Sequence, residues 1–295
     1  MSYQKRAAVD ALFVSSRSMD YFQSCGNMER KIECINFDLD SVLYVPSDFL
    51  ETTLLISIRA MIEVGLKAEA REALSKLKEI RSSDPNARDH FDRLCLHFNK
   101  AFDPVVVAAG IEKYWDCKIG LMTSAPESKA LLSSLYGKYP LAIISNGPPL
   151  KQAGKIVRLG IGHFFSKMDS EKKQTHLFYA TAEERKVKPY PHLWRMSRRE
   201  IGYSPRRALM VGDRFWEDIF GAKRLGMITV KINQGHHSRE TVDEALERGF
   251  RSARQKVYFL RIHSREEIRR LMTPDYAITS LGKLEEVIRA VEESL

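Results

Sequence analysis

Short apolar segments rich in β-branched residues recur along the chain, and helical patterns separate several of them. Such segments, when small or polar residues end them, are typical of strands buried on both faces of a parallel sheet. They lie at residues 32–37, 141–144, 208–211 and 228–232, with further candidates at 176–180 and 276–278. Helical periodicity covers residues 149–159, 191–201 and 217–225. The alternation predicts an α/β fold with an open, mainly parallel sheet, in which ligands bind at the carboxyl ends of the strands.

One long stretch, residues 47–135, interrupts the alternation because it shows helical periodicity and no strand pattern. We expect its first helix to begin with Ser47 as N-cap, and a later one to begin at Asp103-Pro104, with proline at the first helical position. Ser124 and Glu127 form a capping box for a helix that leads back to the sheet. The expected helices cover residues 47–62, 68–80, 87–98 and 103–118.

These patterns predict two domains, one inserted into the other. The inserted domain is all-helical, of the four-helix-bundle type, and spans 47–135. The α/β core is discontinuous and comprises 31–46 and 136–295, while residues 1–30 form an N-terminal extension. A length of 295 residues agrees with about two domains of ~150 residues each.

Composition excludes several classes of protein. A hydrophobic fraction of 44% with 29% charged residues is typical of a globular chain, and no apolar run reaches the roughly 18 residues that span a bilayer. The four cysteines are scattered without a C-x-x-C pair, which favours free thiols in a reducing cytoplasm over disulfides or a zinc site. The N-terminus lacks the pattern of a secretory signal.

Polar residues stand where the predicted strands end. Asp38 and Asp40 follow the first strand, and two carboxylates so close repel each other unless a cation lies between them or one is protonated. Taken alone, this pair is more often an acidic turn. Ser145 and Asn146 end the second strand, where a hydroxyl and backbone N–H groups suit a phosphoryl oxygen, although such a turn is also common without a ligand.

Three further polar residues follow later in the chain. Lys188 precedes a predicted helix, Asp213 follows the strand at 208–211, and Asp218 lies at the start of the next helix. Each has a simple structural explanation, a surface lysine or a carboxylate that faces a helix dipole. Together, in this order, the residues supply what phosphoryl transfer through a covalent aspartate needs: a nucleophile, an acid, a cation site and groups that neutralise the phosphoryl charge.

The ordered set resembles the four motifs of the haloacid dehalogenase superfamily, whose core is Rossmann-like. The helical insert is similar to the C1 cap of its subfamily I. The resemblance runs over residues 31–233 and resumes at 273–276. It rests on Asp38-x-Asp40-x-Val42, Ser145, Lys188-Pro189 and Gly212-Asp213-x-x-x-x-Asp218.

The resemblance implies roles for the motif-one and motif-four residues. Asp38 would be the nucleophile that forms an aspartyl-phosphate, and Asp40 the acid that protonates the leaving group and then the base that activates water. The carboxylates of Asp38 and Asp213 and the backbone carbonyl of Asp40 would bind Mg²⁺, which prefers oxygen ligands. Asp218 would orient Lys188 or metal-bound water.

The resemblance also assigns phosphoryl contacts. Ser145 and the Asn146 amide would hold a phosphoryl oxygen, and Lys188 would balance the charge of the nucleophile and the phosphoryl group. Haloacid dehalogenases proper typically lack the second aspartate of motif one, so Asp40 favours a phosphatase, which would act on a small phosphorylated metabolite. A dehalogenase is the alternative within the superfamily.

Some features depart from the pattern of the superfamily. Ser41 and Val42 stand where glycine or aspartate and threonine are more usual, the run at 166–175 is long, and residues 235–272 form an extra segment. These departures concern the identity of the substrate rather than the chemistry.

The net charge of +9 concentrates in two regions. One surrounds the lysine motif, where it would steer an anionic substrate. Its residues are Arg185, Lys186, Lys188, Arg195, Arg198, Arg199, Arg206 and Arg207. The other lies in the extra segment and is typical either of a solvated helix face or of a surface for nucleic acid. A third hypothesis follows, a catalytically weak member that binds RNA or a protein partner there. The basic residues of this segment are Arg248, Arg251, Arg254, Lys256, Arg261 and Arg265.

Overall fold

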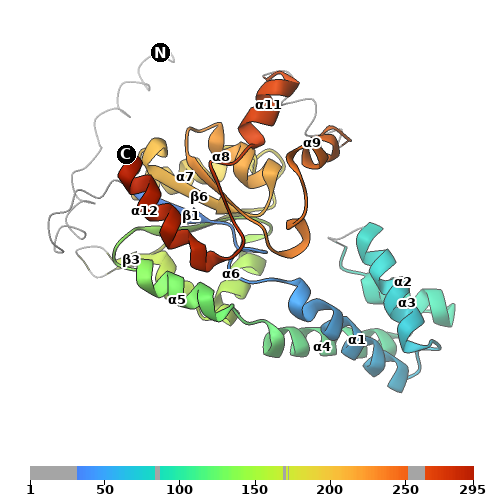
Figure 1. The fold of residues 1–295 in the computed structure, drawn as a ribbon. Helices are drawn as coiled ribbons and strands as arrows, with labels where there is room; N and C mark the ends of the chain where they lie inside the picture. Colours follow the sequence, from blue (N-terminus) through green and yellow to red (C-terminus); the bar gives the residue numbers. More distant parts are fainter. Residues whose placement is uncertain (1–31, 84–86, 169–170, 172, 252–262) are drawn as a thin grey trace, which may run out of the picture. The chain divides into compact units, whose positions relative to one another are not determined.

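The structure is a computed structural model that describes residues 32–83, 87–168, 171, 173–251 and 263–295 (Figure 1). The expected N-terminal extension, 1–30, lies outside the described residues. The chain forms two compact units. Unit 1 comprises the described residues of Met1–Leu43 and Pro126–Leu295, and unit 2 is Tyr44–Ala125.

Unit 1 is built on a six-stranded sheet in which every neighbouring pair of strands is parallel. The strand order is β5-β2-β1-β6-β7-β8. The strands are β1 (Cys34–Phe37), β2 (Leu141–Asn146), β5 (Phe178–Thr181), β6 (Ala208–Gly212), β7 (Ile228–Ile232) and β8 (Tyr276–Ile278). The prediction of an open parallel α/β sheet is confirmed.

Helices connect the strands of unit 1. They are α5 (Pro126–Leu135), α6 (Pro149–Leu159), α7 (His192–Ile201), α8 (Gly221–Lys223), α9 (Val242–Arg251), α11 (Arg265–Met272) and α12 (Leu284–Ser294). A short hairpin of β3 (Ser166–Met168) and β4 (Gln174–His176) stands apart from the sheet. The helix expected at 217–225 differs, because the chain first makes a π-helical turn at Phe215–Phe220 and only then enters α8.

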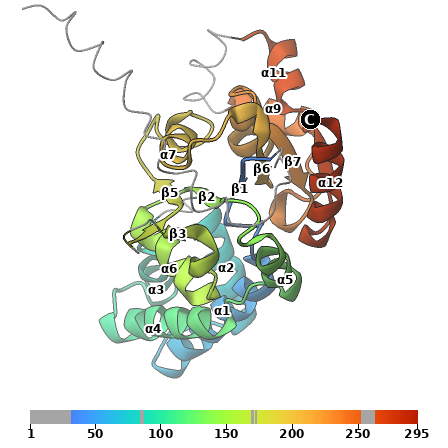
Figure 2. The same ribbon diagram turned by 90° about the vertical axis from the view of Figure 1, so that its left-hand side faces the viewer.

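Side chains alternate between the two faces of the sheet, and both faces are covered. On one face Cys34 and Ile144 pack against Trp194 of α7 in one buried cluster. On the other face the ring of Phe37 meets that of Phe165 edge-on at 6.1 Å. Figures 1 and 2 show α7 on one side of the strands and α12 on the other. The central strands are therefore buried on both faces, which is why their sequences are continuously apolar.

The described residues of unit 2 form helices, which are α1 (Ser47–Glu63), α2 (Ala70–Ser83), α3 (His90–Asn99) and α4 (Pro104–Leu121). Its core combines Leu54 and Ile58 of α1 with Leu77 of α2 and Leu94 of α3. Gly110 of α4 lets α1 approach closely, since a Cβ there would lie 2.6 Å from the sulfur of Met61.

The helix start expected at Asp103 is confirmed, whereas the caps expected at Ser47 and Ser124 are wrong. Asp103 Oδ1 accepts hydrogen bonds from the backbone N–H groups of Val105 and Val106 at 2.9 and 3.3 Å. Pro46, not Ser47, occupies the N-cap of α1. Helix α5 begins at Pro126, so Ser124 lies one residue too early to cap it.

The inserted unit is also shorter than the expected 47–135. Helix α5 belongs to unit 1, because its face binds the C-terminal helix. Ser134 Oγ donates a hydrogen bond to Glu285, and Tyr139 just beyond α5 donates to Glu292 Oε1 at 2.9 Å.

Among the described residues, no helix is long and apolar enough to cross a membrane.

Candidate active site

The candidate residues of the four motifs lie at the carboxyl edge of the unit 1 sheet. Asp38 directly follows β1, and Asp213 directly follows the neighbouring strand β6. Ser145 is the penultimate residue of β2, on the other side of β1, and Lys188 lies in the loop after β5. Because parallel strands all point the same way, these strand ends meet at one edge of the sheet.

Lys188 is the centre of the site. Only 2% of its side chain is exposed, and Nζ lies 2.7 Å from Asp38 Oδ1 and 2.5 Å from Asp218 Oδ1. Burial by itself lowers the pKa of a lysine, but the attraction of Asp218 and Asp38 outweighs it and holds the pKa of Lys188 above its usual value. The ammonium therefore remains charged and ties the nucleophile candidate to a second carboxylate.

Asp218 holds this lysine from the π-helical turn after β6. Its second oxygen, Oδ2, accepts a hydrogen bond from the backbone N–H of Arg214 at 3.0 Å. Both of its oxygens are thus engaged, one by Lys188 and one by the main chain. Gly212 makes this arrangement possible, because a Cβ at that position would overlap the side chain of Asp218. The contacts fit the expected role of orienting Lys188.

Asp38, Asp213 and Asp218 form a buried carboxylate cluster, in which one oxygen of each lies within 4.8 Å of the others. Burial raises the pKa of Asp213 to about 8, with repulsion from Asp218 and Asp38 adding to the effect. Burial likewise raises the pKa of Asp38 to about 6, although Lys188 opposes it. Asp213 Oδ1 is buried and has no hydrogen-bond partner within the described ranges.

This donor set fits a hard divalent cation. Mg²⁺ prefers carboxylate oxygens, and a buried carboxylate oxygen without a donor is satisfied when a cation binds it. Asp38 and Asp213 would hold the ion, since Asp218 already uses both oxygens on Lys188 and the Arg214 main chain.

Asp40 lies at the same edge and faces helix α6. Lys155 Nζ lies 2.6 Å from both carboxylate oxygens of Asp40, and Gln152 Nε2 lies 3.1 Å from Oδ2. The side chain of Asp40 is 36% exposed, whereas that of Lys155 is only 10% exposed. The carboxylate thus reaches solvent on one side and a buried ammonium on the other.

Ser145 and Asn146 have different surroundings. Ser145 Oγ accepts a hydrogen bond from Gln152 Nε2 at 2.8 Å, and a hydroxyl that accepts still has a hydrogen to donate. The Asn146 side chain bonds the main chain of Lys188 twice, at 3.0 and 2.7 Å. The side-chain amide of Asn146 thus positions the Lys188 loop. A contact of Asn146 with a phosphoryl oxygen would therefore be made by its backbone N–H.

Three residues at this edge escaped the sequence analysis: Gln152, Lys155 and Gln234. Gln152 and Lys155 share the buried face of α6 with Ile156 and Leu159. A polar residue at a core-facing position of an amphipathic helix is the signal that identifies them. Gln234, after β7, donates to the carbonyls of Ser41 and Val42 at 2.9 and 2.7 Å and so holds the turn that follows Asp40.

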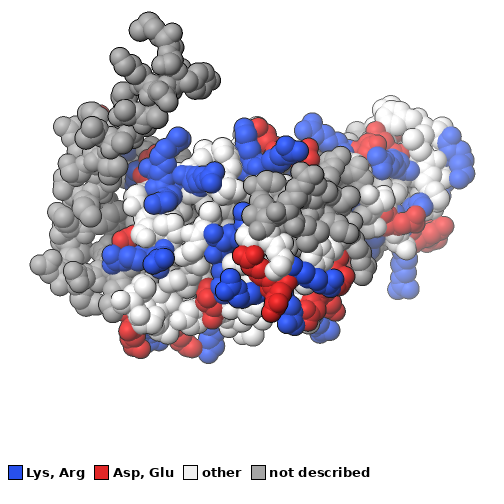
Figure 3. Space-filling view, turned by 90° about the horizontal axis from the view of Figure 1, so that it is seen from above, with Lys and Arg blue, Asp and Glu red and all other residues white. Residues whose placement is uncertain are grey.

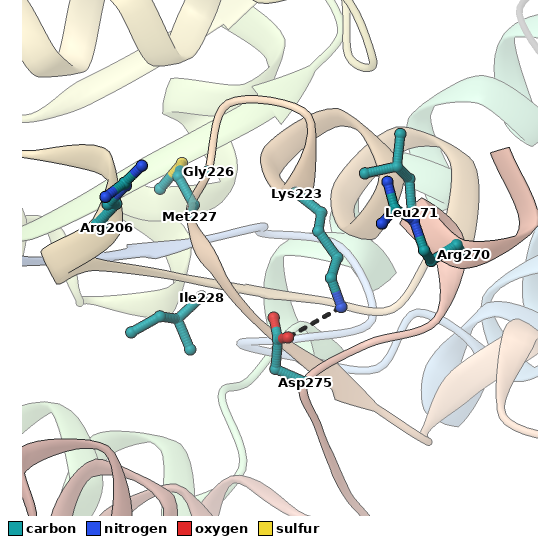
Figure 4. Close-up of a pocket in the computed structure, with 8 residues that line it drawn as sticks. All are labelled: Arg206, Lys223, Gly226, Met227, Ile228, Arg270, Leu271 and Asp275. Atoms are coloured by element: carbon teal, nitrogen blue, oxygen red, sulfur yellow. Dashed lines mark ion pairs between the residues drawn. The ribbon is translucent and has the colours of Figure 1, made fainter. Parts of the chain in front are cut away.

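The basic residues expected around the lysine motif do not all lie near it. Helix α7 returns from the Lys188 loop to the start of β6, and so carries Arg198 and Arg199 toward the amino edge of the sheet. Arg206, just before β6, lines a cavity of about 470 Å³ there, with an ion pair between Lys223 and Asp275 at 2.9 Å (Figure 4). These charges are at the wrong edge to steer a substrate directly to Asp38.

Part of the basic C-terminal segment is paired with acids. Arg248 bonds Glu240 at 2.8 Å, and Arg265 forms an ion pair with Glu247. Figure 3 shows Asp and Glu side chains interspersed with Lys and Arg on the face it draws. Of the other basic residues of this stretch, Arg254, Lys256 and Arg261 lie outside the described residues, and the side chain of Arg251 is not described.

Three features together define the class of haloacid dehalogenase-fold hydrolases. They are an open parallel sheet, acidic residues and a buried lysine at its carboxyl edge, and a helical unit inserted after its first strand. A family model described as haloacid dehalogenase-like hydrolase matches residues 32–226. The chain belongs to this family.

Curated relatives place the chain among the phosphatases of the family. A glyceraldehyde 3-phosphate phosphatase of Methanopyrus kandleri is 34% identical over 213 residues, which is 70% of this chain and 86% of the relative. A protein of the same name from Methanocaldococcus jannaschii is 33% identical over 216 residues, 72% of this chain and 90% of the relative.

Solved structures share the fold. A HAD phosphatase from Thermococcus onnurineus superposes with a TM-score of 0.52 at 18% identity, over 87% of this chain and 98% of that one. A HAD family hydrolase from Deinococcus radiodurans, solved with bound phosphate and sodium, gives a TM-score of 0.52 at 15% identity, over 89% and 97%. The likeness concerns the fold.

Proposed function

We propose that the protein is a Mg²⁺-dependent phosphatase that hydrolyses a small phosphorylated metabolite through an aspartyl-phosphate on Asp38. The observation that carries the proposal is the buried Lys188 between Asp38 and Asp218, with Asp213 beside them. Asp38 thereby has a fixed cationic neighbour. Asp213 keeps a buried oxygen that has no hydrogen-bond partner among the described residues, and such an oxygen suits a metal ion.

The charges of the site support a divalent cation together with an anionic substrate. Four carboxylates, Asp38, Asp40, Asp213 and Asp218, face two ammonium groups, Lys155 and Lys188. Fully ionised, these six side chains carry a net charge of −2, which a divalent cation would offset. Bound Mg²⁺ would supply charge for the phosphoryl oxygens and for the Asp38 carboxylate.

The residues of the chain divide the reaction between them. Since Lys188 engages Oδ1 of Asp38, we assign the attack on phosphorus to Oδ2. The bond between phosphorus and the leaving oxygen breaks as Asp40, which enters this step protonated, gives that oxygen its proton. Asp40 then takes a proton from the water that attacks the phosphoryl group, so that inorganic phosphate leaves and Asp38 is restored. Ser145 donates its hydroxyl hydrogen to a phosphoryl oxygen.

The relatives suggest where to begin with substrates. Proteins named glyceraldehyde 3-phosphate phosphatase match this chain at 33–34% identity over about 70% of its length. We therefore take glyceraldehyde 3-phosphate as the first candidate, within a panel of sugar phosphates and short-acid phosphates.

The test is phosphate release by the purified full-length chain with and without Mg²⁺, followed by the same assay with EDTA. We expect turnover that needs Mg²⁺ and that Asp38→Asn lowers by several orders of magnitude. Asp243→Asn, which changes an exposed carboxylate of α9 that pairs with Arg269 of α11, is the matched control and keeps full activity. Phosphatase activity retained by Asp38→Asn would overturn the mechanism.

Two other outcomes would favour the alternative hypotheses. Halide release from a 2-haloacid without added metal would favour a dehalogenase. RNA retained on a filter, with affinity that falls steeply as salt rises, would favour binding through the basic C-terminal segment.

A further inference from the structure

Helix α6 presents two buried polar side chains to the candidate general acid. Lys155 is 8% exposed and Gln152 is 3% exposed, and they lie three residues apart on the helix face that also carries Ile156 and Leu159. Burying a lysine among apolar neighbours is costly unless its charge is compensated. Both oxygens of Asp40, each 2.6 Å from Nζ, provide that compensation.

Gln152 connects Asp40 to the phosphate-binding end of β2. Its Nε2 lies 3.1 Å from Asp40 Oδ2, 2.8 Å from Ser145 Oγ and 2.7 Å from the carbonyl oxygen of Asn146. A carboxylate and a carbonyl can only accept, so the amide nitrogen, not the amide oxygen, must face them. Gly147 leaves room for this amide, since a Cβ there would lie 3.1 Å from Nε2.

We infer that Lys155 and Gln152 are positioning residues that hold the Asp40 carboxylate in the place from which it exchanges protons with the leaving group and water. The inference rests on the proposed function and adds two residues outside the four motifs. Asp40 follows a strand end and its side chain is 36% exposed, and the bonds from Lys155 and Gln152 restrict its rotamer. A general acid must lie within hydrogen-bond reach of the atom it protonates.

This role predicts a dependence on the leaving group. An alkoxide needs a proton to depart, whereas p-nitrophenolate departs without one. The ratio kcat/KM reports the steps up to departure of the leaving group, before water attacks. Loss of Lys155 therefore lowers kcat/KM for an alkyl phosphate and leaves kcat/KM for p-nitrophenyl phosphate nearly unchanged.

The experiment compares wild type with Lys155→Met and Gln152→Leu on glyceraldehyde 3-phosphate and p-nitrophenyl phosphate, both with saturating Mg²⁺. For Lys155→Met we expect kcat/KM to fall at least about tenfold with the alkyl phosphate, because general acid catalysis is worth about 10²–10⁴-fold in total. The aryl phosphate should change by less than about twofold. Lys155→Arg, which keeps the charge, restores part of the loss. Lys151→Met, at an exposed position of the same helix, is the matched control.

A double variant separates positioning from direct contact with substrate. If Lys155 acts through Asp40, Asp40→Asn with Lys155→Met is no slower than Asp40→Asn alone, because the two losses are not additive. If Lys155 instead binds the phosphoryl group, the losses multiply and KM rises for both substrates, which overturns the inference. Equal losses on the two substrates, or no loss, would also overturn it.

Failure of the proposed function looks different. In that case wild type itself releases no phosphate, or Asp38→Asn is as active as wild type. An active, Asp38-dependent wild type whose Lys155→Met variant shows no leaving-group dependence refutes only the positioning role.

Discussion

Replacing Lys188 by methionine removes the cation from the middle of the site while keeping most of its volume. In the structure this ammonium is 2% exposed and bridges Asp38 and Asp218, whose side chains are 9% and 0% exposed. Removing one partner of a buried ion pair leaves an uncompensated charge and typically costs about 3–5 kcal/mol. We expect Lys188→Met to lose about this much free energy of unfolding at pH 8 in EDTA.

The loss should depend on pH in a defined direction. Burial raises the pKa of Asp38 to about 6 in the wild type, and removing Lys188 raises it further. A raised carboxyl pKa in the folded state destabilises the protein as pH rises through it. At pH 5 the folded state protonates Asp38 in both proteins, so the difference between variant and wild type is largest at pH 8 and shrinks toward pH 5.

Urea unfolding followed by tryptophan fluorescence measures this difference, because Trp194 and Trp216 are buried in unit 1. Lys186→Met is the matched control. Lys186 lies two positions before Lys188 in the same loop, and its side chain is 45% exposed and pairs with Glu183. It should leave the urea midpoint nearly unchanged. An unchanged midpoint for Lys188→Met at pH 8, or a deficit that grows toward pH 5, would refute the reasoning.

Three other predictions concern the same edge of the sheet. Gly212→Ala should displace Asp218 and lower kcat strongly, because the new Cβ would overlap the Asp218 side chain. A thermal melt should still show a folded protein, and a normal kcat would contradict this prediction. Mg²⁺ at a hundredfold excess over its Kd should stabilise the protein by about 2.7 kcal/mol in thermal melts, and Asp213→Asn should remove the effect. The Mg²⁺ affinity should rise between pH 5 and pH 8, as Asp38 and Asp213 lose their protons, and a titration that shows no pH dependence would contradict this.

The sheet and the motif residues were predictable from the sequence for a physical reason. Strands buried on both faces are continuously apolar, and the polar residues that end them stand out against that background. Because parallel strands share one carboxyl edge, Asp38, Ser145 and Asp213 could be expected from the sequence alone to lie together.

The partners of Asp40 were not predictable in this way. Gln152 and Lys155 are 112 and 115 residues away in sequence, and Gln234 bonds Ser41 across 193 residues. No local pattern encodes a contact between one strand end and the buried face of a helix that follows another strand. What the sequence does contain is the anomaly itself, a lysine and a glutamine in an apolar stripe.

Proximity in sequence also misled in one case. Arg198, Arg199 and Arg206 follow Lys188 closely, which suggested a basic rim around the site. Helix α7 runs antiparallel to the strands, so each of its turns carries the chain about 5.4 Å away from the carboxyl edge. The π-helical turn that places Asp218 was equally hidden, since a single turn of this kind has no distinctive composition.

The central claim, that Asp38 receives the phosphoryl group, can be tested by trapping it. Wild type is mixed with glyceraldehyde 3-phosphate carrying a radioactive phosphoryl group, quenched in acid within one turnover, digested and mapped. We expect label on the peptide that contains Asp38, and none when the same peptide comes from Asp38→Asn. Label on a different residue, or wild-type turnover with no labelled protein and undiminished activity in Asp38→Asn, would contradict it.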